Sequence, residues 1–165
     1  MSALPRPEPS AAPLWRDMTA ASLDDVLAIE QAAYEFPWTR GNFIDSQAAG
    51  YLAALLLGAD GTARGYFVAM VGADDMHVLN LTVAPAWQGR GLARVLLDSL
   101  VQRGRDCSAR QLWLEVRVSN VRARAVYERY GLRQVGLRKG YYPAAGGRRE
   151  DALVMSLPLC GRSAR

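Results

Sequence analysis

Apolar residues form short runs in the first half of the chain, and the lengths of these runs indicate β-strands. The runs are Tyr51–Leu57, Tyr66–Val71 and Met76–Val83, and the mixed segment Leu14–Met18 can form a short first strand before them. Asp60-Gly61 lies between Tyr51–Leu57 and Tyr66–Val71, and this dipeptide favours the tight turn of an antiparallel hairpin. The first half of the chain therefore predicts antiparallel strands.

A helical period replaces the strand pattern between Leu14–Met18 and Tyr51–Leu57. Ser22, with Asp25 three residues later, is typical of a helix-opening cap. Phe36-Pro37-Trp38 interrupts the helix, because proline disfavours helical geometry in the residue before it. Thr39 is placed to cap a second helix. Apolar residues at helical spacing support both helices: Val26, Leu27, Ile29, Ala33 and Tyr34 in the first, Phe43 and Ile44 in the second.

A longer helix and a two-faced strand follow Pro85. The helix is predicted by the spacing of Leu92, Val95, Leu96, Leu100 and Val101. In the strand, four apolar residues from Leu112 to Val118 alternate with Trp113, Glu115 and Arg117. Alternate residues of a strand point to opposite faces, so Trp113 and Glu115 share a mixed face.

One more helix and two strands complete the pattern. Ser119 or Asn120 can cap the helix, which runs to Tyr130 and ends at Gly131, where a glycine adopts the left-handed conformation without strain. Leu132–Tyr142 and Ala152–Leu157 then read as strands joined by a glycine-rich loop.

The composition limits the chain to one domain. Its 165 residues, 50% of them hydrophobic, suffice for one core but are few for two ordinary domains. We predict a disordered proline-rich extension over residues 1–13, one domain over residues 14–158 and a flexible tail over residues 159–165. The longest apolar run, Tyr51–Leu57, is far shorter than the roughly 20 residues of a membrane-spanning helix.

Charge and cysteine content limit the kinds of ligand and site that the chain is expected to have. A net charge of +4 agrees with an anionic ligand but falls far short of the basic face of a nucleic-acid binder. Cys107 and Cys160 lie far apart, so neither a disulfide framework nor a zinc site is indicated. We expect a cytoplasmic protein, favour a monomer, and expect no bound metal, no membrane partner and no direct nucleic-acid partner.

The segment Gln88–Ala93 is a candidate anion site. It lies between a predicted strand and a predicted helix, where unpaired N–H groups and the positive end of the helix dipole converge. Gly89 and Gly91 leave room for a phosphate to approach the amides, and Arg90 and Arg94 add positive charge. A flexible loop that binds nothing is the alternative. The lysine of a P-loop and the third glycine of a dinucleotide fingerprint are both missing.

The same loop carries a family resemblance. Gln88-x-x-Gly91-x-Ala93, preceded by Val83-x-Pro85, resembles the Q/R-x-x-G-x-G/A signature of the GNAT acetyltransferases, and the order of predicted elements is similar to theirs over residues 14 to 158. The resemblance implies an α/β (α+β) fold with a mixed, largely antiparallel central sheet of about seven strands flanked by about four helices. It also implies acetyl-CoA as the acetyl donor.

Three further stretches resemble one branch of that superfamily, the ribosomal-protein-alanine N-acetyltransferases (RimI). They are Phe36-Pro37-Trp38, Leu112–Arg117 with Ser119-Asn120, and Tyr141-Tyr142-Pro143 with Arg149–Ala152. The acceptor implied by this resemblance is the N-terminal alanine of a small-subunit ribosomal protein. Gly140 and the glycine-rich Ala144–Arg149 depart from the branch, and both lie on the substrate side.

Glu115 and Tyr127 match the proton acceptor and the proton donor of the family. An α-amino group, with a pKa of about 8, is mostly protonated at neutral pH, so a base assists its attack. A hydroxyl near the departing thiolate assists the second half of the reaction. The residues alone leave simpler alternatives open: Glu115 as a surface residue paired with Arg117, and Tyr127 as a core residue of a helical stripe with Ala123, Val126 and Tyr130.

The resemblance also assigns two sets of binding residues. The acetyl-CoA set contains Leu81, Thr82, Val83, Gln88, Gly89, Arg90, Gly91, Leu92, Ala93, Arg94 and Asn120. The acceptor set contains Phe36, Trp38, Tyr141 and Tyr142. Asn120 is equally explained as a helix cap, the first three residues as strand core, and the aromatic residues as local packing.

Two rival functions remain open at this point. One keeps the chemistry but changes the acceptor to another protein N-terminus, a lysine or a small amine. The other is a non-catalytic module that binds acetyl-CoA. Hydrolase chemistry is not favoured, because His77 is the only histidine and no nucleophile elbow surrounds it.

Overall fold

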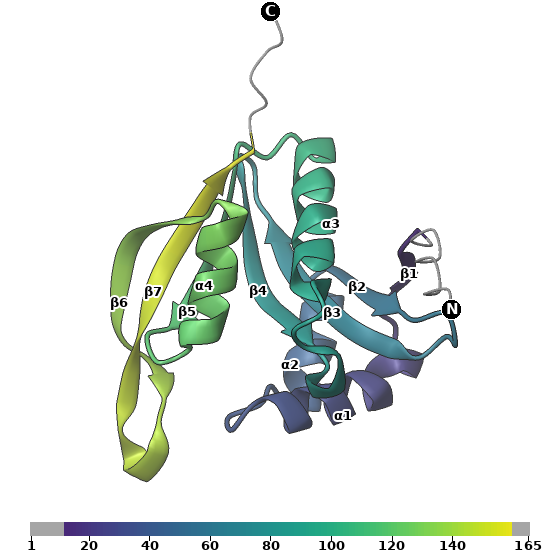
Figure 1. Ribbon diagram of the computed structural model, residues 1–165, viewed down its shortest axis with the longest axis horizontal. Helices are drawn as coiled ribbons and strands as arrows, with labels where there is room; N and C mark the ends of the chain where they lie inside the picture. Colours follow the sequence, from purple (N-terminus) through teal and green to yellow (C-terminus); the bar gives the residue numbers. More distant parts are fainter. Residues whose placement is uncertain (1–11, 160–165) are drawn as a thin grey trace, which may run out of the picture.

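The computed structural model describes residues 12–159 as one seven-stranded sheet with helices on both faces (Figure 1). The strand order is β1-β2-β3-β4-β5-β7-β6, and the β4–β5 pair is parallel whereas the other five pairs are antiparallel. The strands are β1 (Leu14–Asp17), β2 (Leu52–Leu57), β3 (Ala63–Val71), β4 (Asp75–Val83), β5 (Gln111–Arg117), β6 (Arg133–Pro143) and β7 (Arg149–Pro158). The helices are α1 (Leu23–Ala33), α2 (Arg40–Ala48), α3 (Leu92–Asp106) and α4 (Val121–Tyr130).

The predicted fold class is confirmed by this architecture, and the helix boundaries follow local signals. The Thr39 hydroxyl accepts the Asn42 N–H (3.2 Å) at the start of α2, and Gly131 ends α4 with a φ of 118°. Ser22 is the N-cap of α1 as predicted, but its side chain makes no capping hydrogen bond to that helix. Ser22 instead forms a capping box with Thr19 around a short 3₁₀ turn (Ala20–Ser22) that leads into α1.

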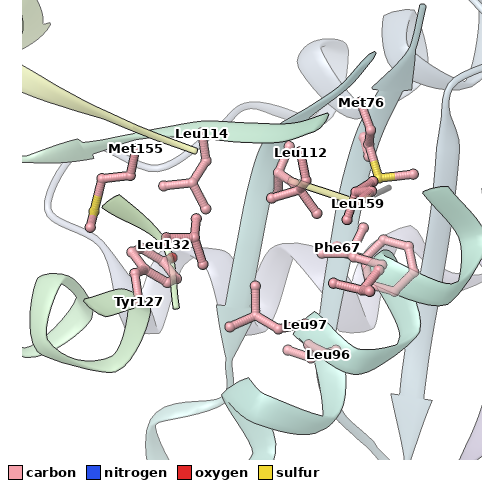
Figure 2. Close-up of a cluster of buried hydrophobic side chains, with 14 of the residues drawn as sticks. Phe67, Met76, Leu96, Leu97, Leu112, Leu114, Tyr127, Leu132, Met155 and Leu159 are labelled. Carbon is pink, nitrogen blue, oxygen red and sulfur yellow. The ribbon is translucent and has the colours of Figure 1, made fainter. Parts of the chain in front are cut away.

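Two hydrophobic clusters lie on opposite faces of the sheet. Consecutive residues of β2 show the division, since Leu55 belongs to the cluster under α1 and α2, and Leu56 to the cluster under α3 and α4. Figure 2 shows part of the second cluster, to which α3, α4 and strands β3 to β5 all contribute. Leu159, which was predicted to begin the flexible tail, is buried in it at 1% exposure.

The predicted extension and tail stay largely untested. Residues 1–11 and 160–165 lie outside the described part of the chain, so most of the predicted extension and most of the predicted tail have no described structure for comparison. Within residues 12–159, every helix is too short or too polar to cross a lipid bilayer.

A bulge in β4 changes which side chains face which helices. Val68 of β3 pairs with Asn80, but Ala69 pairs with Val78, so Leu79 is an extra residue. Before the bulge Val78 packs under α3 and α4, and after it Leu81 packs there while Asn80 turns towards α1. An extra residue shifts the two-residue alternation by one. The bulge therefore sets the side-chain directions at the end of β4.

Candidate active site

The parallel strands β4 and β5 are paired only at their beginnings. The ladder joins Asp75–Val78 to Gln111–Leu114, and beyond it β5 stays paired with β7 up to Arg117. In Figure 1 the later parts of β4 and β5 diverge. The end of β4, the glycine loop and the start of α4 therefore line a common space.

A cavity of about 1190 Å³ lies on the α3–α4 side of this separation. The end of β4, the glycine loop, α3 and α4 all line it. Nine of the eleven residues predicted to bind acetyl-CoA are among its lining: Leu81, Val83, Gln88, Gly89, Gly91, Leu92, Ala93, Arg94 and Asn120. The structure thus brings most of the predicted donor site together.

The glycine loop ends in a helix N-terminus without a side-chain cap. Gly89 and Gly91 have φ values of 76° and 78°, and no side chain hydrogen-bonds to the N-cap of α3. The first amides of a helix have no intrahelical partner, so those of α3 can receive an anion. The Gln88 side chain holds the loop, donating to the Val83 carbonyl (3.2 Å) and accepting from Arg122 Nη1 (3.2 Å).

Two predicted acetyl-CoA residues do not line the cavity. Thr82 is 2% exposed and lies on the α1 side, where its hydroxyl donates to Asn80 Oδ1 (2.7 Å). Arg90 places its guanidinium 4.5 Å from the centre of the Trp87 ring. For Thr82 the β4 bulge is the cause, because it turns Asn80 and Thr82 away from α3.

Tyr34 and Arg122 line the cavity without having been predicted there. The Tyr34 hydroxyl donates to the Leu81 carbonyl (3.2 Å) and shares a hydrogen bond with the Thr82 hydroxyl (2.7 Å). Burial raises the pKa of Tyr34 to about 12, despite the Thr82 hydrogen bond, which lowers it. Tyr34 ends the first helical stripe in the sequence, but nothing local distinguishes it from a core residue.

Glu115 is buried on the opposite face of the sheet from the cavity. Its side chain is 5% exposed, and its strand neighbours Leu114 and Val116 point to the α3–α4 side instead. Its Oε2 lies 2.6 Å from His77 Nε2, and its Oε1 lies 3.3 Å from Arg138 Nε. The alternative of a surface glutamate paired with Arg117 is therefore wrong.

Tyr127 faces both the core and the cavity. It is 8% exposed, belongs to the α3–α4 cluster and also lines the cavity. Burial raises its pKa well above the usual value of a phenol, and the nearby Tyr34 and Tyr142 raise it further. The hydroxyl of Tyr127 thus stays protonated at neutral pH.

Three of the four predicted acceptor residues surround Arg117 and Glu115. The Arg117 guanidinium lies 5.4 Å from the Phe36 ring and 4.5 Å from the Tyr142 ring, and it pairs with Glu150 at 3.1 Å. Tyr141 packs edge-on against Tyr142, with ring centres 4.9 Å apart. Burial and the nearby Glu115 raise the pKa of both tyrosines. These rings lie on the Glu115 side of the sheet.

Trp38, the fourth predicted acceptor residue, packs inward. Its ring lies 5.1 Å from that of Phe43. The backbone N–H of Trp38 donates to Oε1 of Glu30 (3.0 Å), a carboxylate that is 2% exposed and also accepts from Tyr66 and Asn80. Glu30 thereby fixes the segment Phe36-Pro37-Trp38 to the sheet, a role that the sequence pattern did not reveal.

Comparisons with known proteins agree with this geometry. The acetyltransferase (GNAT) family model matches residues 23–132. A [ribosomal protein bS18]-alanine N-acetyltransferase from Salmonella typhimurium is 38% identical over 142 residues, which cover 86% of this chain and 95% of that protein. The protein of the same description from Escherichia coli K12 is 38% identical over 131 residues, covering 79% of this chain and 87% of that protein.

Solved structures give the same result. The crystal structure of the ribosomal-protein-S18-alanine N-acetyltransferase from Escherichia coli superposes with a TM-score of 0.81 and 33% identity, covering 93% of this chain and 99% of that one. The structure of yncA from Salmonella typhimurium with acetyl-CoA shares the fold, with a TM-score of 0.72, 20% identity and coverage of 94% and 98%. The chain therefore belongs to the GNAT family of acetyltransferases.

Proposed function

We propose that this enzyme transfers the acetyl group of acetyl-CoA to the N-terminal alanine amine of the small-subunit ribosomal protein S18. The observation that carries the proposal is the placement of two sites at the β4–β5 separation. A cavity with a helix N-terminus lies on one face of the sheet, and a buried carboxylate with aromatic neighbours lies on the other. The S18-directed activity of the relatives supports the choice of acceptor.

The donor cavity suits the anionic and apolar parts of acetyl-CoA. The uncapped amides of α3 and the guanidinium groups of Arg94 and Arg122 would hold the pyrophosphate. Leu81 and Val83 at the end of β4 would contact the pantetheine arm, and β4 amides beside them would stabilise the oxyanion that forms at the thioester carbonyl.

The proposed reaction is a direct attack of the amine on the thioester. Glu115 takes a proton from the acceptor ammonium, directly or through water, and the freed nitrogen attacks the carbonyl carbon. The carbon–sulfur bond then breaks, and the electron pair leaves on the sulfur. The nitrogen releases its second proton to water, which balances the proton that the thiolate takes up. Because its raised pKa keeps Tyr127 protonated, its hydroxyl supports the developing thiolate as a hydrogen-bond or proton donor.

A peptide panel tests the acceptor. Release of the coenzyme A thiol would be measured with an S18 N-terminal peptide beginning with alanine, the same peptide blocked at its N-terminus, a lysine peptide and small amines. We expect kcat/KM for the alanine peptide to exceed that of every other acceptor by at least about tenfold, since one correctly placed contact is worth that much. Turnover of a lysine or a small amine at an equal or higher rate would contradict the proposed acceptor.

The non-catalytic alternative has a separate outcome. An acetyl-CoA-binding module would bind acetyl-CoA but release no thiol with any acceptor in the panel. The presence of a buried carboxylate and a protonated tyrosine near the separation favours the enzyme.

A glycine substitution tests the donor site. Gly91→Ala is expected to weaken acetyl-CoA binding about tenfold, because the methyl group and the strained backbone disturb the amides that receive the anion. Gly61→Ala is a matched control: both glycines have φ near +80° and open space where a Cβ would lie, but Gly61 lies in the β2–β3 turn. Both changes should cost about 1 kcal/mol of folding stability, measured by urea unfolding. Equal acetyl-CoA affinities by calorimetry would contradict the proposed site.

A further inference from the structure

The only histidine of the chain is in contact with the proposed base. His77 pairs with Trp113 in the parallel ladder, and Glu115 lies two residues further along β5 on the same face. This register places His77 Nε2 at 2.6 Å from Glu115 Oε2, with the two side chains 12% and 5% exposed. The contact therefore follows from the sheet register rather than from two mobile side chains.

The surroundings fix the His77 ring in one orientation. It stacks on the Trp113 indole, with ring centres 3.5 Å apart and planes 9° apart, and the indole N–H donates to Asp75 Oδ2 (3.2 Å). Arg138 reaches across from β6, with its guanidinium 5.7 Å from the Trp113 ring. The charged groups around the imidazole are thus Asp75, Glu115 and Arg138.

The two oxygens of Glu115 have different environments. Oε2 is engaged by the imidazole. Oε1 is enclosed and has no hydrogen-bond partner among the described residues, although Arg138 Nε lies 3.3 Å away. The Arg138 side chain is 48% exposed. Because Oε2 is engaged by His77, Oε1 is the oxygen left for a proton from an acceptor.

We propose that His77 is a positioning residue for the base Glu115, an inference that rests on the proposed function. The imidazole Nε2–H donates to Oε2 and so directs Oε1 towards the acceptor amine. In the proton-transfer step one N–H bond of the ammonium breaks and one O–H bond forms at Oε1, while the imidazole keeps its proton.

Two substitutions separate this role from simple packing. His77→Leu fills similar space without a donor, and His77→Gln offers an N–H donor. We expect His77→Leu to lower kcat by about tenfold or more, within the range of general-base effects, with no change in KM for acetyl-CoA. His77→Gln should restore most of the activity, because its amide N–H can donate to the Glu115 carboxylate.

The same substitutions in a Glu115→Gln background provide the decisive measurement. If His77 acts through Glu115, His77→Leu should cause no further loss of kcat once the carboxylate is gone. One acceptor peptide is used throughout. Equal losses in both backgrounds, or a His77→Gln variant no more active than His77→Leu, would overturn the positioning role. If His77→Leu does not fold, His77→Gln decides: most of the parent's kcat supports the role, and a loss of about tenfold or more overturns it. If Glu115→Gln is as active as the parent, the proposed mechanism fails first.

Discussion

Glu115→Gln is expected to lower kcat for acetyl transfer by about 10²- to 10⁴-fold near neutral pH, the range typical of a general base. The amide has nearly the shape of the carboxylate but cannot accept the proton of the ammonium. Acetyl-CoA affinity should not change, because Glu115 faces away from the donor cavity. Thiol release with the S18 peptide measures the loss, and calorimetry with acetyl-CoA alone checks binding.

The loss of kcat in Glu115→Gln should change with pH in a defined direction. Above the amine pKa of about 8 the acceptor is increasingly neutral and needs a base less, so the deficit of Glu115→Gln should shrink as the pH rises. Glu128→Gln is the matched control, because Glu128 is an exposed carboxylate on α4. A deficit that is constant with pH, or a similar loss in Glu128→Gln, would count against Glu115 as the base.

Tyr127→Phe is expected to lower kcat by about 10- to 100-fold, somewhat below the usual effect of a general acid because a weak donor can be replaced in part by water. The phenyl ring retains the packing of Tyr127 in the α3–α4 cluster, so the free energy of unfolding should change by about 1 kcal/mol or less. Thiol release and urea unfolding measure the two quantities.

Two comparisons make the tyrosine prediction specific. Tyr51→Phe removes a hydroxyl from a partly buried ring in the other cluster and should leave kcat unchanged. The raised pKa of Tyr127 keeps it protonated up to about pH 10 and beyond, so the pH profile of Tyr127→Phe should run parallel to that of the parent. Loss of stability with an unchanged kcat would show that Tyr127 is only a core residue.

Local signals made much of the fold predictable. Asn120 and Gly131 bound α4 as expected, the first by accepting the Ala123 N–H (3.1 Å) and the second by its left-handed backbone. Gly89 and Gly91 likewise marked the loop before α3. Capping, glycine conformation and hydrophobic period depend on neighbours within a few residues, so they can be read from the sequence.

The partners of the active-site groups were not predictable in the same way. Glu115 contacts His77 and Arg138, which lie 38 and 23 positions away in the chain. Their meeting depends on the register of four strands, β4, β5, β7 and β6. Arg117, the nearest candidate partner, pairs with Glu150 instead, because β7 and not β4 accompanies β5 to its end. The direction of the Thr82 side chain depends on the β4 bulge, and no residue of β4 predicts a bulge from the sequence.

A short ladder joins β4 to β5 within the sheet. It has four residue pairs, against seven between β5 and β7. Hydrogen bonds from Tyr130 to Asp98 (2.7 Å) and from Arg122 to Gln88 (3.2 Å) also link α4 to α3 and to the loop before it. A ligand held between α3 and α4 touches both helices and acts as a further joint, stabilising the folded state as its concentration rises above its Kd. Hydrogen exchange in α3 and α4 would then slow together, because the bound donor molecule contacts both helices and links their local unfolding.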